Sequence, residues 1–132
     1  MSVNQELEEN LDHSNNNTSE SDVAMLLSNT NRLLSAVGIT AKTITTIEEL
    51  TRAASSMFVA VFESLFHVRI EGVVRNPSER DYALNAQLVV DNLSDQIQMD
   101  LKHITGMSIV GGDIRALSNL VHILVRIVSI TR

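Results

Sequence analysis

The stretch from Leu101 to Asp113, LKHITGMSIVGGD, brings together residue types from which active-site loops are built. It holds a histidine, a threonine, a serine, three glycines and an aspartate. Glycines that lead into the N-terminus of a helix can bind phosphate, because free backbone N–H groups point at the anion. Here, however, no lysine follows the glycines at the spacing of a phosphate-binding loop. Asp113 would also place a negative charge where the phosphate has to sit.

We therefore interpret this stretch as a connection between two helices and not as an active site. Gly106, Gly111 and Gly112 are expected to form turns, and Asp113 is expected to cap the helix that follows. The histidine and the threonine should bond to nearby backbone groups. Four apolar side chains should point into the core: Leu101, Ile104, Ile109 and Val110.

The other residues capable of chemistry do not form a recognisable site. The chain contains no cysteine, so thiolate metal sites, disulfides and cysteine nucleophiles are excluded. No two of the four histidines are spaced as metal ligands on a helix, and no serine stands in a G-x-S-x-G elbow. The acidic pairs Glu48–Glu49 and Glu79–Asp81 fall in the first turns of expected helices, where they offset the helix dipole. The sequence predicts no catalytic residue, no metal and no cofactor, and hence a protein that is not an enzyme.

The negative charge of the chain is concentrated at its N-terminus. The formal net charge is −6 over 132 residues. Residues 1–22 contain six acidic side chains and no lysine or arginine, whereas residues 23–132 contain ten of each sign. Residues 1–20 are also poor in apolar side chains and rich in Asn, Ser and Glu, which predicts a disordered acidic tail. The near-neutral remainder, residues 21–132, is long enough for one domain, and its charge balance argues against a nucleic-acid partner. An uninterrupted apolar run of membrane-spanning length is absent, so a membrane partner is not expected either.

Helical periodicity organises the first half of the domain. Apolar residues from Val23 to Val37 recur at helical spacing, with Ser19 or Ser21 as a cap and Gly38 just past the end. A second, short helix is expected near residues 47–54, opened by a capping box that pairs Thr45 with Glu48 or Thr46 with Glu49. A third helix, over residues 56–67, carries all three phenylalanines and should be the central core helix.

The sequence of the second half of the domain predicts two longer helices. One should begin at Asn76, with Pro77 in its first turn, and should end near Leu93 or Asp95. It is expected to bury Tyr82, Ala86, Val89, Val90 and Leu93. After an irregular segment, a last helix should run from Ile114 to the end, with one narrow polar stripe: Arg115, Asn119, His122, Arg126 and Ser129.

A β-strand over residues 68–74 is the main alternative, because VRIEGVV is rich in β-branched side chains. Apolar and polar residues fail to alternate over most of the chain, however, while helical spacing recurs in four windows. We therefore predict an all-α fold with at most one short extended pair.

The last helix is apolar on several faces, and a domain this small cannot easily bury all of them. Either a partner or further native chain is expected to cover the rest. The sequence stops at Arg132 without a capping signal, which predicts an N-terminal fragment of a longer protein.

Residues 83–127 also carry a resemblance to a known family. The motif H-I-T-G-x-x-I-V-x-G-D, from His103 to Asp113, and the helices on either side of it resemble the divergent calponin-homology-like domains of the NN-CH type, which are found in kinetochore and centrosomal proteins. The match covers most of residues 22–131 loosely. The resemblance implies an orthogonal bundle of about five to six helices. It also implies a cytoskeletal protein of the cytoplasm, at a centrosome, basal body or cilium, whose remainder is coiled coil.

Two partner hypotheses follow from this resemblance. In the first, the domain binds tubulin in microtubules, and four basic side chains contact the acidic tubulin surface: Arg69, Arg75, Arg80 and Lys102. In the second, it is an assembly module that pairs with a second copy, or with another calponin-homology-like or coiled-coil protein of the centrosome or cilium. The contact is made through apolar surface of the last helix or through a mobile loop at residues 68–76. The microtubule-binding members of the family have clustered lysines, whereas residues 21–132 contain only Lys42 and Lys102. This departure leaves docking between proteins at least as well supported as tubulin binding.

Overall fold

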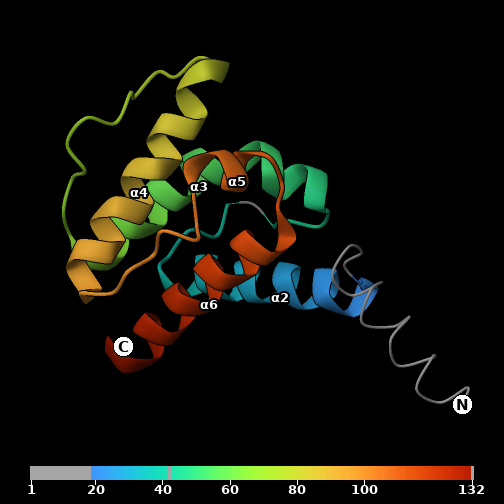
Figure 1. The fold of residues 1–132 in the computed structure, drawn as a ribbon. Coiled ribbons are helices and arrows are strands. Elements are labelled where there is room, and N and C mark those ends of the chain that lie inside the picture. The colour runs from blue at the N-terminus through green and yellow to red at the C-terminus, as the bar shows by residue number, and fades with distance from the viewer. Residues whose placement is uncertain (1–18, 42, 132) are drawn as a thin grey trace, which may run out of the picture.

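The computed structural model describes residues 19–41 and 43–131, and these form helices joined by loops (Figure 1). The helices are α2 (Glu20–Ala36), α3 (Ile47–Phe66), α4 (Tyr82–Ile97), α5 (Gly106–Val110) and α6 (Ile114–Thr131), with a 3₁₀ turn η1 (Glu79–Asp81) before α4. No described residue lies in a strand, so the all-α prediction is confirmed and the alternative strand over residues 68–74 is not formed. The disordered tail predicted over residues 1–20 falls outside the described ranges, except for Ser19 and Glu20.

The helices pack in two groups. Helices α2 and α6 lie against each other, while α4 packs against both α3 and α5 (Figure 1). Contacts of α3 with α2, and of α5 with α6, join the two groups. A single apolar core runs between them, and every α-helix contributes to its largest fully buried side chains, among them Leu33, Phe58, Leu93, Ile109 and Leu120. The calponin-homology-like orthogonal arrangement of these helices stays a prediction.

Helix α2 has the start and the buried face that the sequence predicts. The Ser19 hydroxyl accepts a hydrogen bond from the Asp22 N–H at 3.1 Å, which satisfies one of the free donors at the helix start. Leu26, Leu33 and Leu34 are buried on one side. Gly38 follows the end of the helix with a φ of 86°, a left-handed conformation that glycine adopts without strain.

Helix α3 corrects the prediction of two helices at residues 47–54 and 56–67. It is one helix of 20 residues, and the Thr46 hydroxyl caps it by accepting the Glu49 N–H at 3.1 Å. Neither glycine nor proline stands between the two apolar patterns, so nothing interrupts the backbone hydrogen bonds there. Ala54 and Ser55, at the predicted break, are both buried, so packing holds this part of the helix in place.

Helix α4 begins later than predicted. Ser78, and not Asn76, caps the 3₁₀ turn η1 that leads into α4, and the Asp81 carboxylate accepts from the Ser78 N–H at 2.9 Å and from the Ser78 hydroxyl at 3.0 Å. Because the Asp81 carboxylate accepts a hydrogen bond from the Ser78 N–H, the pKa of Asp81 lies below its ordinary value. Tyr82 is only half-buried, contrary to prediction, whereas the next inward position is a polar residue, Asn85.

Candidate partner-binding surface

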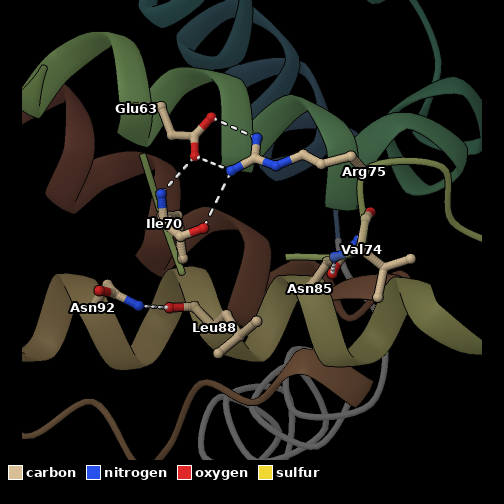
Figure 2. Close-up of polar contacts among 7 residues, drawn as sticks. All are labelled: Glu63, Ile70, Val74, Arg75, Asn85, Leu88 and Asn92. Carbon is tan, nitrogen blue, oxygen red and sulfur yellow. Dashed lines mark hydrogen bonds and ion pairs between the residues drawn. The ribbon is translucent and has the colours of Figure 1, made fainter. Parts of the chain in front are cut away.

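The loop between α3 and α4 is tied to both helices by polar side chains (Figure 2). The Glu63 carboxylate on α3 accepts two hydrogen bonds from the Arg75 guanidinium, at 2.9 Å and 2.6 Å, and a third from the Ile70 N–H at 2.6 Å. Arg75 also donates to the Ile70 carbonyl at 3.1 Å. The Arg75 guanidinium, helped by the Ile70 N–H, holds the pKa of Glu63 below its ordinary value. The loop predicted to be mobile at residues 68–76 is therefore fastened to α3.

The same loop is fastened to α4 by Asn85, which is 3% exposed. Its side-chain carbonyl accepts the Val74 N–H at 2.9 Å, and its side-chain amide donates to the Val74 carbonyl at 3.0 Å. One side chain thus satisfies both backbone groups of Val74, as a neighbouring strand would. The sequence analysis missed Asn85, because a lone asparagine at an inward helical position gives no sign of the loop that it will meet.

The four basic residues predicted to contact tubulin do not form one patch. Arg75 uses both terminal nitrogens of its guanidinium on Glu63, with an N–O distance of 2.6 Å. Arg69 and Lys102 are exposed in different loops, and Arg80 is exposed in η1. The 16-residue helix α4 separates Arg80 from Lys102, a length of about 24 Å.

The glycine-rich connection around α5 holds its helices by close approach and by caps. Gly106 is the first residue of α5 and does not form the turn predicted for it. A Cβ added there would lie 2.1 Å from the Ala83 carbonyl oxygen of α4, so only glycine lets the two backbones meet. The Gly106 N–H donates to the Gln87 side chain at 2.8 Å across the same contact. Thr105 caps α5 by accepting the Ser108 N–H at 3.0 Å.

The end of this connection adopts a turn and a cap. Gly111 ends α5 with a φ of −82°, and Gly112 has a φ of 79°, a left-handed conformation. The Asp113 carboxylate then accepts the N–H groups of Arg115 and Ala116, at 3.0 Å and 3.2 Å, at the start of α6. His103 is exposed. In the part of the chain that the structure describes, no three His, Asp or Glu side chains gather as metal ligands would.

Helix α6 is buried along one face as far as Leu124 and only partly covered at its tip. Leu117, Leu120 and Leu124 are completely buried. We call the apolar residues of its last two turns the α6 tip: Val125, Ile127, Val128 and Ile130. Ile130 is 77% exposed and the other three are half-buried. Figure 1 shows why, since this end of α6 reaches the edge of the molecule.

Helix α6 is also long and apolar enough to cross a membrane, judged by length and composition alone. The core helix of a domain can pass the same test, and α6 packs along α2. Arg115 and Arg126 lie on its exposed stripe. A charged side chain at the centre of a bilayer is unfavourable, by about 3 kcal/mol.

Comparisons with known proteins match part of the chain. Residues 70–127, from the fastened loop to the α6 tip, match a family described as a domain of unknown function (DUF5745). The chain is similar to the centrosomal protein of 95 kDa of Mus musculus, with 35% identity over 79 residues, and equally to that of Rattus norvegicus. The aligned part is 58% of this chain and 10% of each relative. The chain thus spans about a tenth of the length of the curated relatives that it matches. No solved structure matches it.

Proposed function

We propose that this domain is a non-enzymatic assembly module of a centrosomal protein, and that it pairs with a second copy, or with a related helical protein, through the α6 tip. The observation that carries the proposal is the apolar tip itself: Val125, Ile127 and Val128 are half-exposed where they pack on the core, and Ile130 is mostly exposed. Exposed apolar surface of this kind, continuous with a helix face, is typical of helix pairing. The similarity to a protein named for the centrosome supports the location.

The test is the solution mass of the chain over a range of concentrations, with Ile130→Glu as the variant. Ile130 is mostly exposed, so the substitution should leave the domain folded while placing a charge in the proposed contact. We expect the native chain to dimerise as concentration rises and the variant to stay monomeric. Ser129→Glu is the matched control, because it adds the same charge on the neighbouring polar stripe. A native chain that stays monomeric throughout contradicts pairing with a second copy.

Direct microtubule binding is the competing proposal, and it rests on the exposed basic residues Arg69, Arg80 and Lys102. It loses the contribution of Arg75, whose charge is paired with Glu63. Co-sedimentation with microtubules at low and high salt separates the two proposals, because a charge contact weakens with salt and an apolar one does not. Pelleting at low salt that is lost in Arg69→Gln or Lys102→Gln would favour tubulin.

We further propose a place in the cytoskeleton, at the centrosome or at the basal body of a cilium, and a calponin-homology-like arrangement of the helices. Both extend the similarity to a centrosomal protein and the all-α architecture. We also propose that the domain needs no membrane or nucleic acid, since residues 23–132 carry equal numbers of acidic and basic side chains.

A further inference from the structure

A groove of about 540 Å³ lies between α3, the start of α4 and α5, within the group of helices that does not contain α6. Its lining comes from all three helices and from η1: Thr51, Arg52, Ser55, Glu79, Arg80, Tyr82, Ala83, Met107 and Val110. The volume is in the range of sites that bind small ligands or a few side chains of a peptide. None of the roles described above for the α6 tip involves this surface.

Two arginines stand at this groove on different elements, Arg52 on α3 and Arg80 on η1. Both side chains are exposed and neither forms an ion pair within 4 Å with another described residue, although the charge of Arg80 acts on the neighbouring Asp81 carboxylate. Glu79 is the single acidic side chain of the lining, so the groove has an excess of positive charge. Two guanidinium groups against one carboxylate favour an anionic ligand, because guanidinium groups form charge-assisted hydrogen bonds with carboxylates.

Ser55 is a polar side chain of the same lining that lacks a partner. It lies on α3, is 4% exposed, and its hydroxyl makes no hydrogen bond to any described residue. A buried hydroxyl without a partner is unfavourable by about 1–3 kcal/mol, so such groups are uncommon away from binding sites. Ser55 lies on α3, three residues after Arg52, and lines the groove, so a bound acceptor there can accept a hydrogen bond from its hydroxyl.

The remaining lining is apolar and adaptable. Met107 on α5 is 72% exposed, and Val110 and Ala83 are half-buried beside it. Methionine is flexible and polarisable, and it is enriched on surfaces that bind peptides. An exposed methionine beside unpaired arginines suits a ligand that offers an apolar side chain next to a negative charge.

We propose that this groove binds an acidic segment of a partner protein, in which carboxylates flank an aliphatic side chain. Arg52 and Arg80 bind the carboxylates, Met107 and Val110 cover the aliphatic side chain, and Ser55 donates to the peptide. The chemistry of the groove differs from that of the α6 tip, which is apolar throughout. The groove is lined by residues of α3, η1, α4 and α5 and not of α6, so the two surfaces can be occupied at once.

The test is fluorescence anisotropy with the 132-residue chain and a fluorescein-labelled peptide of sequence GEELEELG. Two control peptides, GQQLQQLG and GEESEESG, remove the charges or the leucines. At physiological salt we expect the chain to bind GEELEELG and neither of the two control peptides. Arg52→Gln or Arg80→Gln should raise the dissociation constant for GEELEELG about tenfold. Arg126→Gln removes an equal charge from the exposed stripe of α6 and should change the dissociation constant less than about twofold.

Ser55→Ala separates a ligand contact from a structural role. Because it removes an unpaired buried hydroxyl and introduces a better helix former, the melting temperature should stay the same or rise. Peptide binding should nevertheless weaken about threefold. A melting temperature that falls, together with unchanged binding, would show that Ser55 serves the fold and would remove it from the site.

Three results would overturn the proposal. One is equal binding of the uncharged peptide, and another is an equal loss of affinity in Arg126→Gln and Arg80→Gln, which would show a diffuse charge effect. The third is binding of an oligodeoxythymidine with the same sensitivity to Arg52 and Arg80, which would make the groove a nucleic-acid site. None of these results depends on whether the α6 tip pairs.

Discussion

Two irregular segments connect the helices of this domain, and they are held in different ways. The segment between α3 and α4 is fastened by side chains that reach it from both neighbouring helices: Glu63 and Arg75 on one side, and Asn85 on the other. The segment between α4 and α6 is fastened by close approach at Gly106 and by caps made by residues adjacent in sequence, Thr105 and Asp113.

The difference between the two segments explains why the sequence predicted the structure of one better than that of the other. Caps and turn glycines act within a few residues of where they stand, so the sequence pattern marks the caps at Thr105 and Asp113 and the turn at Gly112, whereas the contact of Gly106 with α4 depends on packing. The partners of the first segment are 11 or 12 residues apart along the chain and meet only when the helices pack. A loop without capping residues or glycine turns in its sequence can thus still be held in place, by side chains from the helices that it meets.

The largest effect is expected for Gly106→Ala, which tests the close approach in the second segment. The added Cβ would lie 2.1 Å from the Ala83 carbonyl oxygen and 2.8 Å from the Gln87 nitrogen, both backbone atoms of α4. Helix α5 must then move away from α4, and we expect a loss of about 3 kcal/mol in the free energy of unfolding, measured by urea denaturation.

Gly38→Ala is the control for that experiment, because a Cβ there meets nothing within 4 Å. Its φ of 86° should produce only the strain of a left-handed residue, about 1 kcal/mol. Gly106 itself does not have a positive φ, so a loss no larger than that of Gly38→Ala would contradict the close approach of α4 and α5 as the reason for glycine there.

The next largest effect is expected for Asn85→Ala, which tests the first segment. It leaves the Val74 N–H and carbonyl without partners in a partly buried place, a loss of about 2–3 kcal/mol by urea denaturation. Asn92→Ala is the matched control, since the Asn92 amide donates only to the Leu88 carbonyl of its own helix (Figure 2). We expect that control to lose about 0.5 kcal/mol. Similar losses for the two asparagines would mean that the loop is not held by α4.

A smaller, pH-dependent effect is expected for Glu63→Gln. At pH 7 the variant should lose about 1 kcal/mol, because the charge-assisted bonds to Arg75 become neutral ones. The pKa of Glu63 is lowered in the folded protein, so the stabilisation is complete above its ordinary value of 4.5 and is lost as the pH falls through the lowered folded value. The difference in melting temperature between the native chain and the variant should therefore shrink in acid.

Glu71→Gln provides the control for charge alone, since Glu71 is an exposed carboxylate of the same loop. Its melting temperature should follow that of the native chain at every pH. A difference for Glu63→Gln that stays constant down to pH 2 would contradict an ionised Glu63 as the fastening group.

An effect no larger than that of Glu63→Gln is expected for Asp113→Ala, which removes a local cap of the second segment. The free energy of unfolding should fall by about 1 kcal/mol, because two N–H groups at the start of α6 lose their acceptor. Asp113→Asn keeps an acceptor oxygen and should restore most of the loss. If asparagine and alanine are equally destabilising, the negative charge and not the hydrogen bond is what α6 requires.

The local features of the fold could be predicted from the amino-acid sequence. The apolar spacing of α2 and α6, the Ser19 cap and the all-α class depend on residues within one or two helical turns of each other. The Thr46 cap also follows from its own neighbourhood. Short-range hydrogen bonding and helical periodicity are properties of neighbouring residues, which is why the chain order reveals them.

Other features depended on which surfaces met in space. The continuity of α3, the burial of Asn85 and the pairing of Arg75 with Glu63 follow from packing between elements. The groove brings Arg52, Ser55 and Arg80 together with Met107, which lies about 25 to 55 positions further along the chain. No local sequence pattern predicts such a groove. A helix pattern defines which side of each helix is apolar, but the partner of each polar side chain is set by the way the helices are arranged around one core.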